Sequence, residues 1–187
     1  MTATLYTLQD FVTEARDIAS RGLADDATLE AIVEPLSRII SRPDCLADME
    51  PSGNPDPDKG FTLVDEPHLT ILAVVWPEGG GAPVHNHNGW AIEGVISGLE
   101  RNRNFERRDD GQTPWRAQLE EVEPTIVPAG STTCLALPPH DIHAVEIPQG
   151  KTLALHVYGI DLLHQWRYRF DLETGDVGPY RRSTAAR

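Results

Sequence analysis

Residues 70–107 read TILAVVWPEGGGAPVHNHNGWAIEGVISGLERNRNFER, and this stretch decides the fold. It opens with Thr70–Trp76, a run that is apolar and rich in branched side chains and that ends at Pro77 and three nearby glycines. Leu99–Arg107 then alternates between side-chain types after a turn at Gly98. Branched and alternating runs separated by Gly and Pro are typical of β-strands. The stretch therefore predicts strands joined by tight connections.

Further strand signals follow at 125–127, 144–147 and 153–158, and turn residues separate them. Many short strands with regular turns favour a sandwich or a barrel. We therefore predict a mainly β fold, in which residues 61–170 form a β-barrel.

The N-terminal segment, residues 1–40, has a helical pattern instead. Its apolar residues recur with the spacing of one helix face, at Leu8, Phe11, Val12, Ala15, Ile18 and Ala19, and again at Leu29, Ile32, Val33, Leu36, Ile39 and Ile40. Pro35 should kink or split the second helix. We expect a single domain of residues 1–187, with a helical cap (1–40), a loop (41–60), the barrel (61–170) and a tail (171–187).

Composition narrows the classes of partner. The chain has 187 residues and a formal net charge of −13, which disfavours nucleic acid and anionic membranes as partners. Its two cysteines exclude a disulfide framework. No apolar run is long enough to span a bilayer and no signal peptide is evident, so we expect a cytoplasmic protein. The sequence does not indicate an oligomeric state.

His85 and His87 form a His-x-His pair after a glycine-rich lead-in. On a strand, residues i and i+2 point to the same face, so their imidazoles can converge on one metal ion. Two exposed histidines in a loop are the alternative.

A third histidine can reach the same place if residues 143–156 form a hairpin. With Gln149 and Gly150 as the central turn residues, His143 faces His156 across the pair. Tyr158 is two residues further along the strand and shares that face. A one-residue slip would break this arrangement. The alternative for His156 is a core histidine that is hydrogen-bonded to Tyr158.

Four separated blocks occur in an order typical of one known family. They are PVHNHNGW (83–90), GVISG (94–98), DIHAVE (141–146) and LHVYG (155–159). Together they resemble the cysteine dioxygenase family of cupins, and most closely its bacterial 3-mercaptopropionate dioxygenase branch. The resemblance covers about residues 58–170. It implies a cupin double-stranded β-helix, or jelly-roll barrel, with an N-terminal helical segment.

The resemblance also implies roles for individual residues. His85, His87 and His143 would be the metal ligands of a non-haem Fe(II). His156 and Tyr158 would be catalytic residues that orient substrate and oxygen, with Tyr158 donating a hydrogen bond. Two further residues would bind substrate: Trp90 would line the pocket, and Arg167 would hold a carboxylate. The alternative for Arg167 is a surface arginine, and Arg169 has the same side-chain parity.

The sequence departs from the family pattern at several positions. Ala154 stands where the family's Ser-His-Tyr series begins, so His156 loses its outer hydrogen-bond partner. No cysteine lies between His87 and Gly98, so the thioether of eukaryotic members cannot form. Glu93 stands where thiol-oxidising relatives carry an apolar residue. It is a candidate fourth ligand, a contact for a substrate amine, or a salt-bridged strand residue.

The function implied is an iron-dependent thiol dioxygenase that converts a small thiol carboxylate, 3-mercaptopropionate or cysteine, to its sulfinate with O2. The small thiol and O2 are the partners that this reading implies. Two alternatives remain at this stage. One is a cupin dioxygenase acting on a non-thiol substrate such as a diketone, and the other is a non-enzymatic cupin that binds a small ligand.

Overall fold

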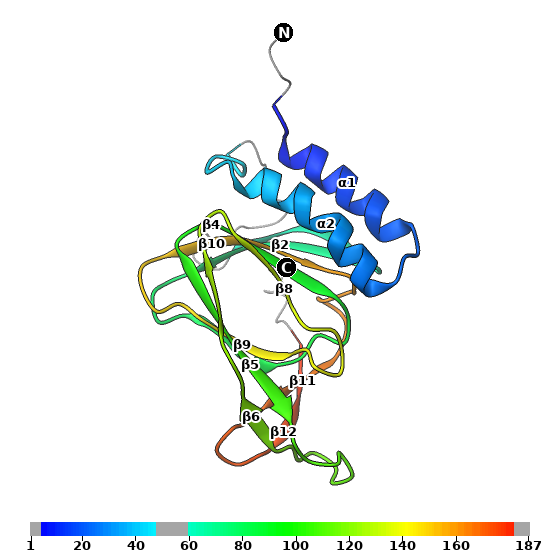
Figure 1. The fold of residues 1–187 in the computed structure, drawn as a ribbon, viewed down its shortest axis with the longest axis vertical. Helices are drawn as coiled ribbons and strands as arrows, with labels where there is room; N and C mark the ends of the chain where they lie inside the picture. Colours follow the sequence, from blue (N-terminus) through cyan, green and yellow to red (C-terminus); the bar gives the residue numbers. More distant parts are fainter. Residues whose placement is uncertain (1–4, 48–59, 182–187) are drawn as a thin grey trace.

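The computed structural model describes residues 5–47 and 60–181. Within these ranges, two helices precede a series of antiparallel strands (Figure 1). The elements are α1 (Leu8–Ser20), α2 (Asp25–Ile40), β1 (Phe61–Glu66), β2 (Leu69–Trp76), β3 (Gly81–His85), β4 (Ala91–Ser97), β5 (Leu99–Arg107), β6 (Leu119–Glu121), β7 (Thr125–Pro128), β8 (Thr132–Cys134), β9 (Ile142–Glu146), β10 (Thr152–Tyr158), β11 (Arg167–Phe170) and β12 (Val177–Tyr180).

The strands form two sheets that face each other. One has the order β1-β2-β10-β4-β8, and the other has the order β12-β11-β3-β9-β5-β6, with β7 also paired to β5. Consecutive strands often lie in different sheets, so the chain winds back and forth between the two layers (Figure 1). This is the double-stranded β-helix that was expected.

The side chains of strand β4 alternate between the barrel interior and the core beneath the helices. Its alternate residues Ala91 and Val95 pack inside the barrel, whereas Ile92 and Ile96 join the core under the helices. Gly94 lies against α2, where an added Cβ would come within 3.0–3.2 Å of Leu36 and Ile40 side-chain atoms. A glycine at this position therefore lets the helix pack closely on the sheet.

The helical cap forms as the apolar spacing predicted. Its buried residues pack on the outer face of the five-stranded sheet, above β2, β4 and β10 (Figure 1). Thr7 and Asp10 form the capping box that starts α1. The expectation that Pro35 would split the second helix is wrong, because α2 runs through it from Asp25 to Ile40.

One boundary in the sequence-based division differs from the structure. The barrel does not end at residue 170, because β12 pairs with β11 and adds Val177–Tyr180 to the larger sheet. The expected loop at 41–60 and the end of the tail lie partly outside the described residues, which omit 48–59 and 182–187.

The predicted hairpin between His143 and His156 is also wrong. Strand β9 pairs with β3 and β5, whereas β10 pairs with β2 and β4, so these histidines belong to opposite sheets. His143 instead pairs with His85 across β9 and β3. The Pro148–Gly150 turn carries the chain from one sheet to the other, and the two histidines approach a common cavity from facing walls.

Neither helix in the described part of the chain is long and apolar enough to cross a lipid bilayer.

Candidate metal centre

The three histidines expected to bind metal lie together at the end of β3 and on the neighbouring β9. Possible ligand atoms of His85, His87 and His143 all lie within 4.8 Å of one another, and all three residues are buried. The Nε2 atoms of His87 and His143 are 2.9 Å apart. Two nitrogens that bind one metal at right angles, each about 2.1 Å from it, would be about 3.0 Å apart. The spacing therefore fits a shared metal ion.

Two of these rings are held by an acceptor at the nitrogen that faces away from the cluster. His85 Nδ1 lies 2.7 Å from the carbonyl oxygen of Pro83, and His143 Nδ1 lies 2.7 Å from Asn102 Oδ1. An acceptor at Nδ1 places the proton there and leaves Nε2 to bind metal. This is the arrangement that metal-ligating histidines usually have.

His87 is held differently. Its Nδ1 lies 3.2 Å from a guanidinium nitrogen of Arg167, which is a donor, so this contact does not select the same tautomer. The main chain at this point is fixed by Asp141, whose Oδ2 accepts hydrogen bonds from the backbone N–H groups of His87 and Asn88. Asn88 has a φ of 64°, and the chain turns sharply there after leaving β3.

Burial and nearby positive charge keep these imidazoles neutral. Desolvation, followed by the charge of Arg167, lowers the pKa of His85 to about 3. Desolvation and the neighbouring rings hold the pKa values of His87 and His143 well below 6.5. Neutral imidazole is the form that binds metal, so burial favours the metal-binding charge state of all three rings.

These residues fit a transition-metal ion. Among the described residues, the cluster consists of three imidazoles without a carboxylate. Imidazole suits zinc, copper, iron and nickel, so the donor set alone does not select one of them. Glu93 does not join this cluster but belongs to another, with Glu100 and His156.

The three histidines open on a cavity of about 500 Å³ between the two sheets. His156 and Tyr158 line it from β10, and Glu93 lines it from β4. Arg167, which is buried, and Tyr180 line it from β11 and β12. Arg169, the alternative to Arg167, is exposed. The structure thus brings all six polar residues expected at the site around one cavity, namely His85, His87, His143, His156, Tyr158 and Arg167.

Trp90 lies elsewhere. Its side chain packs in the core beneath the helices, and it is absent from the described residues that line the histidine cavity. The cause is strand parity, because Ala91 and Glu93 face the barrel interior and Trp90 therefore faces the other way. The expectation that Trp90 lines the pocket needs this correction.

Glu93 is buried, and its hydrogen bond is made by one of its two carboxylate oxygens. Its Oε2 accepts a hydrogen bond from Asn102 Nδ2 at 2.7 Å, whereas its Oε1 lies 3.6 Å from His156 Nδ1. Desolvation, with a smaller effect from Glu100, raises the pKa of Glu93 to about 7. A neutral or half-ionised carboxyl therefore sits on the wall of the cavity at physiological pH.

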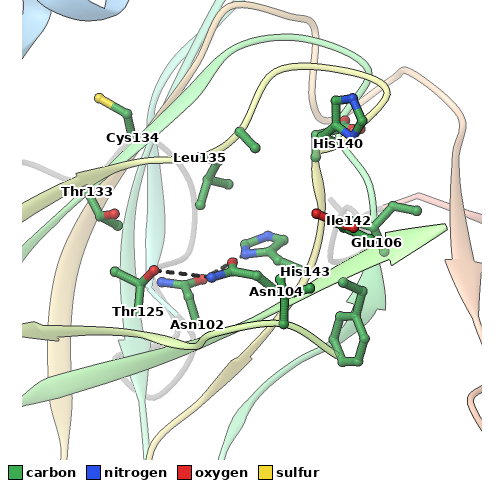
Figure 2. Close-up of a pocket in the computed structure, with 14 residues that line it drawn as sticks. Asn102, Asn104, Glu106, Thr125, Thr133, Cys134, Leu135, His140, Ile142 and His143 are labelled. Atoms are coloured by element: carbon green, nitrogen blue, oxygen red, sulfur yellow. Dashed lines mark hydrogen bonds between the residues drawn. The ribbon is translucent and has the colours of Figure 1, made fainter. Parts of the chain in front are cut away.

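Two further residues of this region, Glu100 and Asn102, carry no signal in the sequence that marks them as part of the site. Both lie on β5, and their side chains point inward, whereas Arg101 and Arg103 reach outward to Glu146. Asn102 and Asn104 extend from β5 beside His143, where a second pocket of about 370 Å³ also reaches that histidine (Figure 2). Both faces of β5 are polar, so alternation alone does not show which face is buried.

The topology and the paired sheets decide the architecture. The fold is a double-stranded β-helix. No protein-family model matches the chain. Similar solved structures include a cupin 2 conserved barrel domain protein from Leptotrichia buccalis, with 22% identity and a TM-score of 0.40 over 54% of this chain. The chain spans only 39% of the length of that protein.

Two further cupins show a comparable level of likeness. A cupin superfamily protein from Desulfitobacterium hafniense DCB-2 is 16% identical with a TM-score of 0.39, over 58% of this chain and 83% of that one. An RmlC-like cupin from Ralstonia eutropha JMP134 is 13% identical with a TM-score of 0.43, over 65% of each chain. The chemistry of this protein is argued below from its own residues.

Proposed function

We propose that this cupin is an Fe(II)-dependent thiol dioxygenase that converts a small thiol carboxylate to its sulfinate, RSH + O2 → RSO2H. The observation that carries the proposal is the buried cluster of His85, His87 and His143, which contains no carboxylate and opens on a cavity that Arg167 also lines. The resemblance of the sequence to the cysteine dioxygenase family supports it.

The composition of the ligand set favours an anionic sulfur ligand. Three neutral imidazoles bring no negative charge, so a divalent ion among them keeps its full charge. Bound iron would supply a site where thiolate and dioxygen lie side by side, and the four electrons that dioxygen accepts would come from the sulfur as it is oxidised from thiol to sulfinate. A site with a carboxylate ligand would already be partly neutralised and would attract a thiolate less strongly.

Arg167 is the residue that would hold the substrate carboxylate. Its guanidinium is buried, lies 3.2 Å from His87 Nδ1, and stacks at 5.0 Å over the ring of Tyr180. A guanidinium fixed in this way offers two parallel N–H groups, which suit a carboxylate. A substrate held by its carboxylate beside His87 would present its thiol to the three-histidine cluster.

Apolar side chains form part of the cavity wall. Val74, Val145 and Leu162 line it together with the polar residues. His156 and Tyr158 lie on the opposite sheet from His85 and His143, so a small substrate would sit between the two groups. Fixing thiol and oxygen side by side in a site of low polarity is the main contribution that the protein can make.

The test is oxygen uptake by the iron-reconstituted protein with a panel of thiols, with sulfinate detected by mass spectrometry. The panel compares 3-mercaptopropionate and cysteine with cysteamine, which lacks a carboxylate, and with acetylacetone, a diketone. We expect uptake with the carboxylate thiols and one sulfinate formed per O2. Uptake only with the diketone, or none with any thiol at full iron loading, would refute the proposal.

A further inference from the structure

His156 has a partner at each ring nitrogen, and both partners are buried. Its Nε2 lies 3.2 Å from both carboxylate oxygens of Glu100, and its Nδ1 lies 3.0 Å from the hydroxyl oxygen of Tyr158. Glu100 is fully buried, and His156 and Tyr158 are 3% and 5% exposed. The three side chains thus form one series, from the start of β5 to the cavity wall.

The chemistry of these groups sets the direction of the hydrogen bonds. An ionised carboxylate only accepts, so the proton of a neutral His156 has to lie on Nε2. Nδ1 is then an acceptor, and the hydroxyl of Tyr158 donates to it. We propose that Glu100 is a positioning residue that fixes this tautomer of His156 and thereby the direction of the Tyr158 hydroxyl.

The fold holds Glu100 in place. Thr152 at the start of β10 binds the backbone of Leu99 at both polar groups, since its Oγ1 accepts from Leu99 N and donates to Leu99 O, each at 3.0 Å. Gly98, with a φ of 87°, allows this approach, because an added Cβ would lie 2.5 Å from Thr152 Oγ1. The start of β5 is therefore clamped against the strand that carries His156.

Glu100 also provides the hydrogen bond to His156 that a polar side chain at position 154 would otherwise provide. Ala154 is fully buried and packs among apolar residues of the barrel interior, so it offers His156 no hydrogen bond. Glu100 supplies the outer partner from the opposite sheet. A serine hydroxyl could donate or accept, whereas a carboxylate accepts only, so the exchange restricts the series to one direction.

The direction of the hydrogen bond between Tyr158 and His156 determines which atom Tyr158 offers to a substrate. This inference rests on the proposed function. With its proton committed to His156, Tyr158 presents an acceptor oxygen to the cavity. This reverses the role expected from the sequence, in which Tyr158 donates a hydrogen bond. The hydroxyl oxygen would therefore accept, rather than donate, in any hydrogen bond that it forms with the substrate.

A second metal ion among Glu93, Glu100 and His156 is the competing explanation, because their possible ligand atoms also lie within 4.8 Å of one another. A metal there would have to take a ring nitrogen of His156 from Glu100 or from Tyr158. The hydrogen-bonded series accounts for both nitrogens without an ion.

The tautomer is measured directly by NMR of ¹⁵N-histidine-labelled protein loaded with Zn²⁺, a diamagnetic probe. A His156→Asn variant assigns the signal of this ring. We expect the proton on Nε2 in the wild-type protein, retained in Glu100→Gln, whose carbonyl still accepts. In Glu100→Met the proton should move to Nδ1, where Tyr158 and Glu93 offer acceptors.

Three results would overturn the proposal. The first is a wild-type His156 that carries a proton on Nδ1, alone or in addition to Nε2. The second is an unchanged tautomer in Glu100→Met. The third is binding of a second Zn²⁺ that shifts the His156 signal. The wild-type spectrum alone shows which nitrogen of His156 carries the proton, so the proposal is tested even if Glu100→Met does not fold.

Kinetics of the iron-loaded protein supply a second readout. Glu100→Met should lower kcat for the thiol about 10–100-fold, as losses of residues that orient an active group do. Tyr158→Phe in that background should add no further loss, because the two residues act as one unit. Glu106→Met, on the same strand but half-buried, is the matched control and should be unchanged.

If Glu100→Met and Tyr158→Phe lowered kcat independently, so that the double variant lost more than either single variant, the proposal that they act as one unit would be contradicted. If the wild-type protein oxidises no thiol, the proposed function fails, whereas the NMR result still decides the role of Glu100.

Discussion

Asn102 accepts a hydrogen bond from Nδ1 of His143 at 2.7 Å, and its amide nitrogen donates to Glu93 at 2.7 Å. One side chain thus links a candidate metal ligand to the buried carboxyl on the opposite sheet. Since an amide has a fixed donor end and a fixed acceptor end, the donor bond to Glu93 leaves Asn102 Oδ1 to face His143. The tautomer of His143 that can bind metal through Nε2 is selected in this way.

Asn102→Ala should therefore weaken metal binding about 10–100-fold, because His143 loses the acceptor that orients it. Competition with a chromophoric chelator measures the affinity for Fe(II) or Zn²⁺. Asn104→Ala is the matched control on the same strand, since the Asn104 amide donates to Glu123 O and Thr125 Oγ1 instead. Equal affinities of wild type and Asn102→Ala would show that this contact does not orient the ligand.

The ligand assignment itself predicts a change in metal stoichiometry. His143→Ala should lose stoichiometric iron, because only two of the three imidazoles remain. Metal analysis after reconstitution and gel filtration gives the ratio of iron to protein. His140→Ala removes an exposed histidine three residues earlier and should keep the wild-type ratio. A full complement of iron in His143→Ala would remove this residue from the ligand set.

The burial of Arg167 predicts an effect that depends on the substrate. Arg167→Ala should raise KM for 3-mercaptopropionate and cysteine at least about 10-fold, as expected for loss of a charged hydrogen bond of roughly 1.5–3 kcal/mol. Cysteamine, which lacks a carboxylate, should be oxidised with little change. Arg169→Ala, two residues along the same strand and exposed, is the control. A similar KM increase for all three thiols would indicate a structural role for Arg167.

The sequence predicts much of this architecture because its signals are local. The apolar spacing of 8–19 and 29–40 defines the helices, and the run 70–76 and the alternating 99–107 match β2 and β5 closely. The His-x-His pair is likewise a local feature, although only His85 lies within β3 and His87 follows it.

Pairing between sheets is not a local property, and the errors arise there. Pro148–Gly150 has the residues of a tight turn, but turn chemistry does not tell whether the chain returns to the same sheet or crosses to the other. The predicted hairpin has His143 opposite His156 within one sheet, whereas in the structure the two residues lie on facing sheets. Both geometries bring the two side chains toward one cavity, so the site was inferred through an incorrect pairing.

The buried polar residues were missed for a different reason. Glu100 and Asn102 alternate with Arg101 and Arg103, so neither side-chain set is apolar and the inner face of β5 carries no hydrophobic signal. Their burial depends on polar partners contributed by β4, β9 and β10. Such partners are recognisable only once the sheets are assembled.

The raised pKa of Glu93 predicts how stability depends on pH. Its pKa is about 7 in the folded protein and 4.5 in an unfolded chain. Below pH 4.5 both states bind the proton and Glu93 has no pH-dependent effect. As the pH rises from 4.5 to 7, the unfolded chain ionises first, so the folded state loses stability. The shift limits this loss to about 3 kcal/mol.

Glu93→Gln should remove this penalty, because an amide does not ionise. In urea unfolding of the protein in EDTA, the variant should gain free energy of unfolding relative to wild type at pH 8, and the gain should be smaller by up to about 3 kcal/mol at pH 5. A gain for Glu93→Gln that is the same at pH 5 and pH 8 would mean that Glu93 is ionised in the folded protein throughout, with a compensating positive charge beside it.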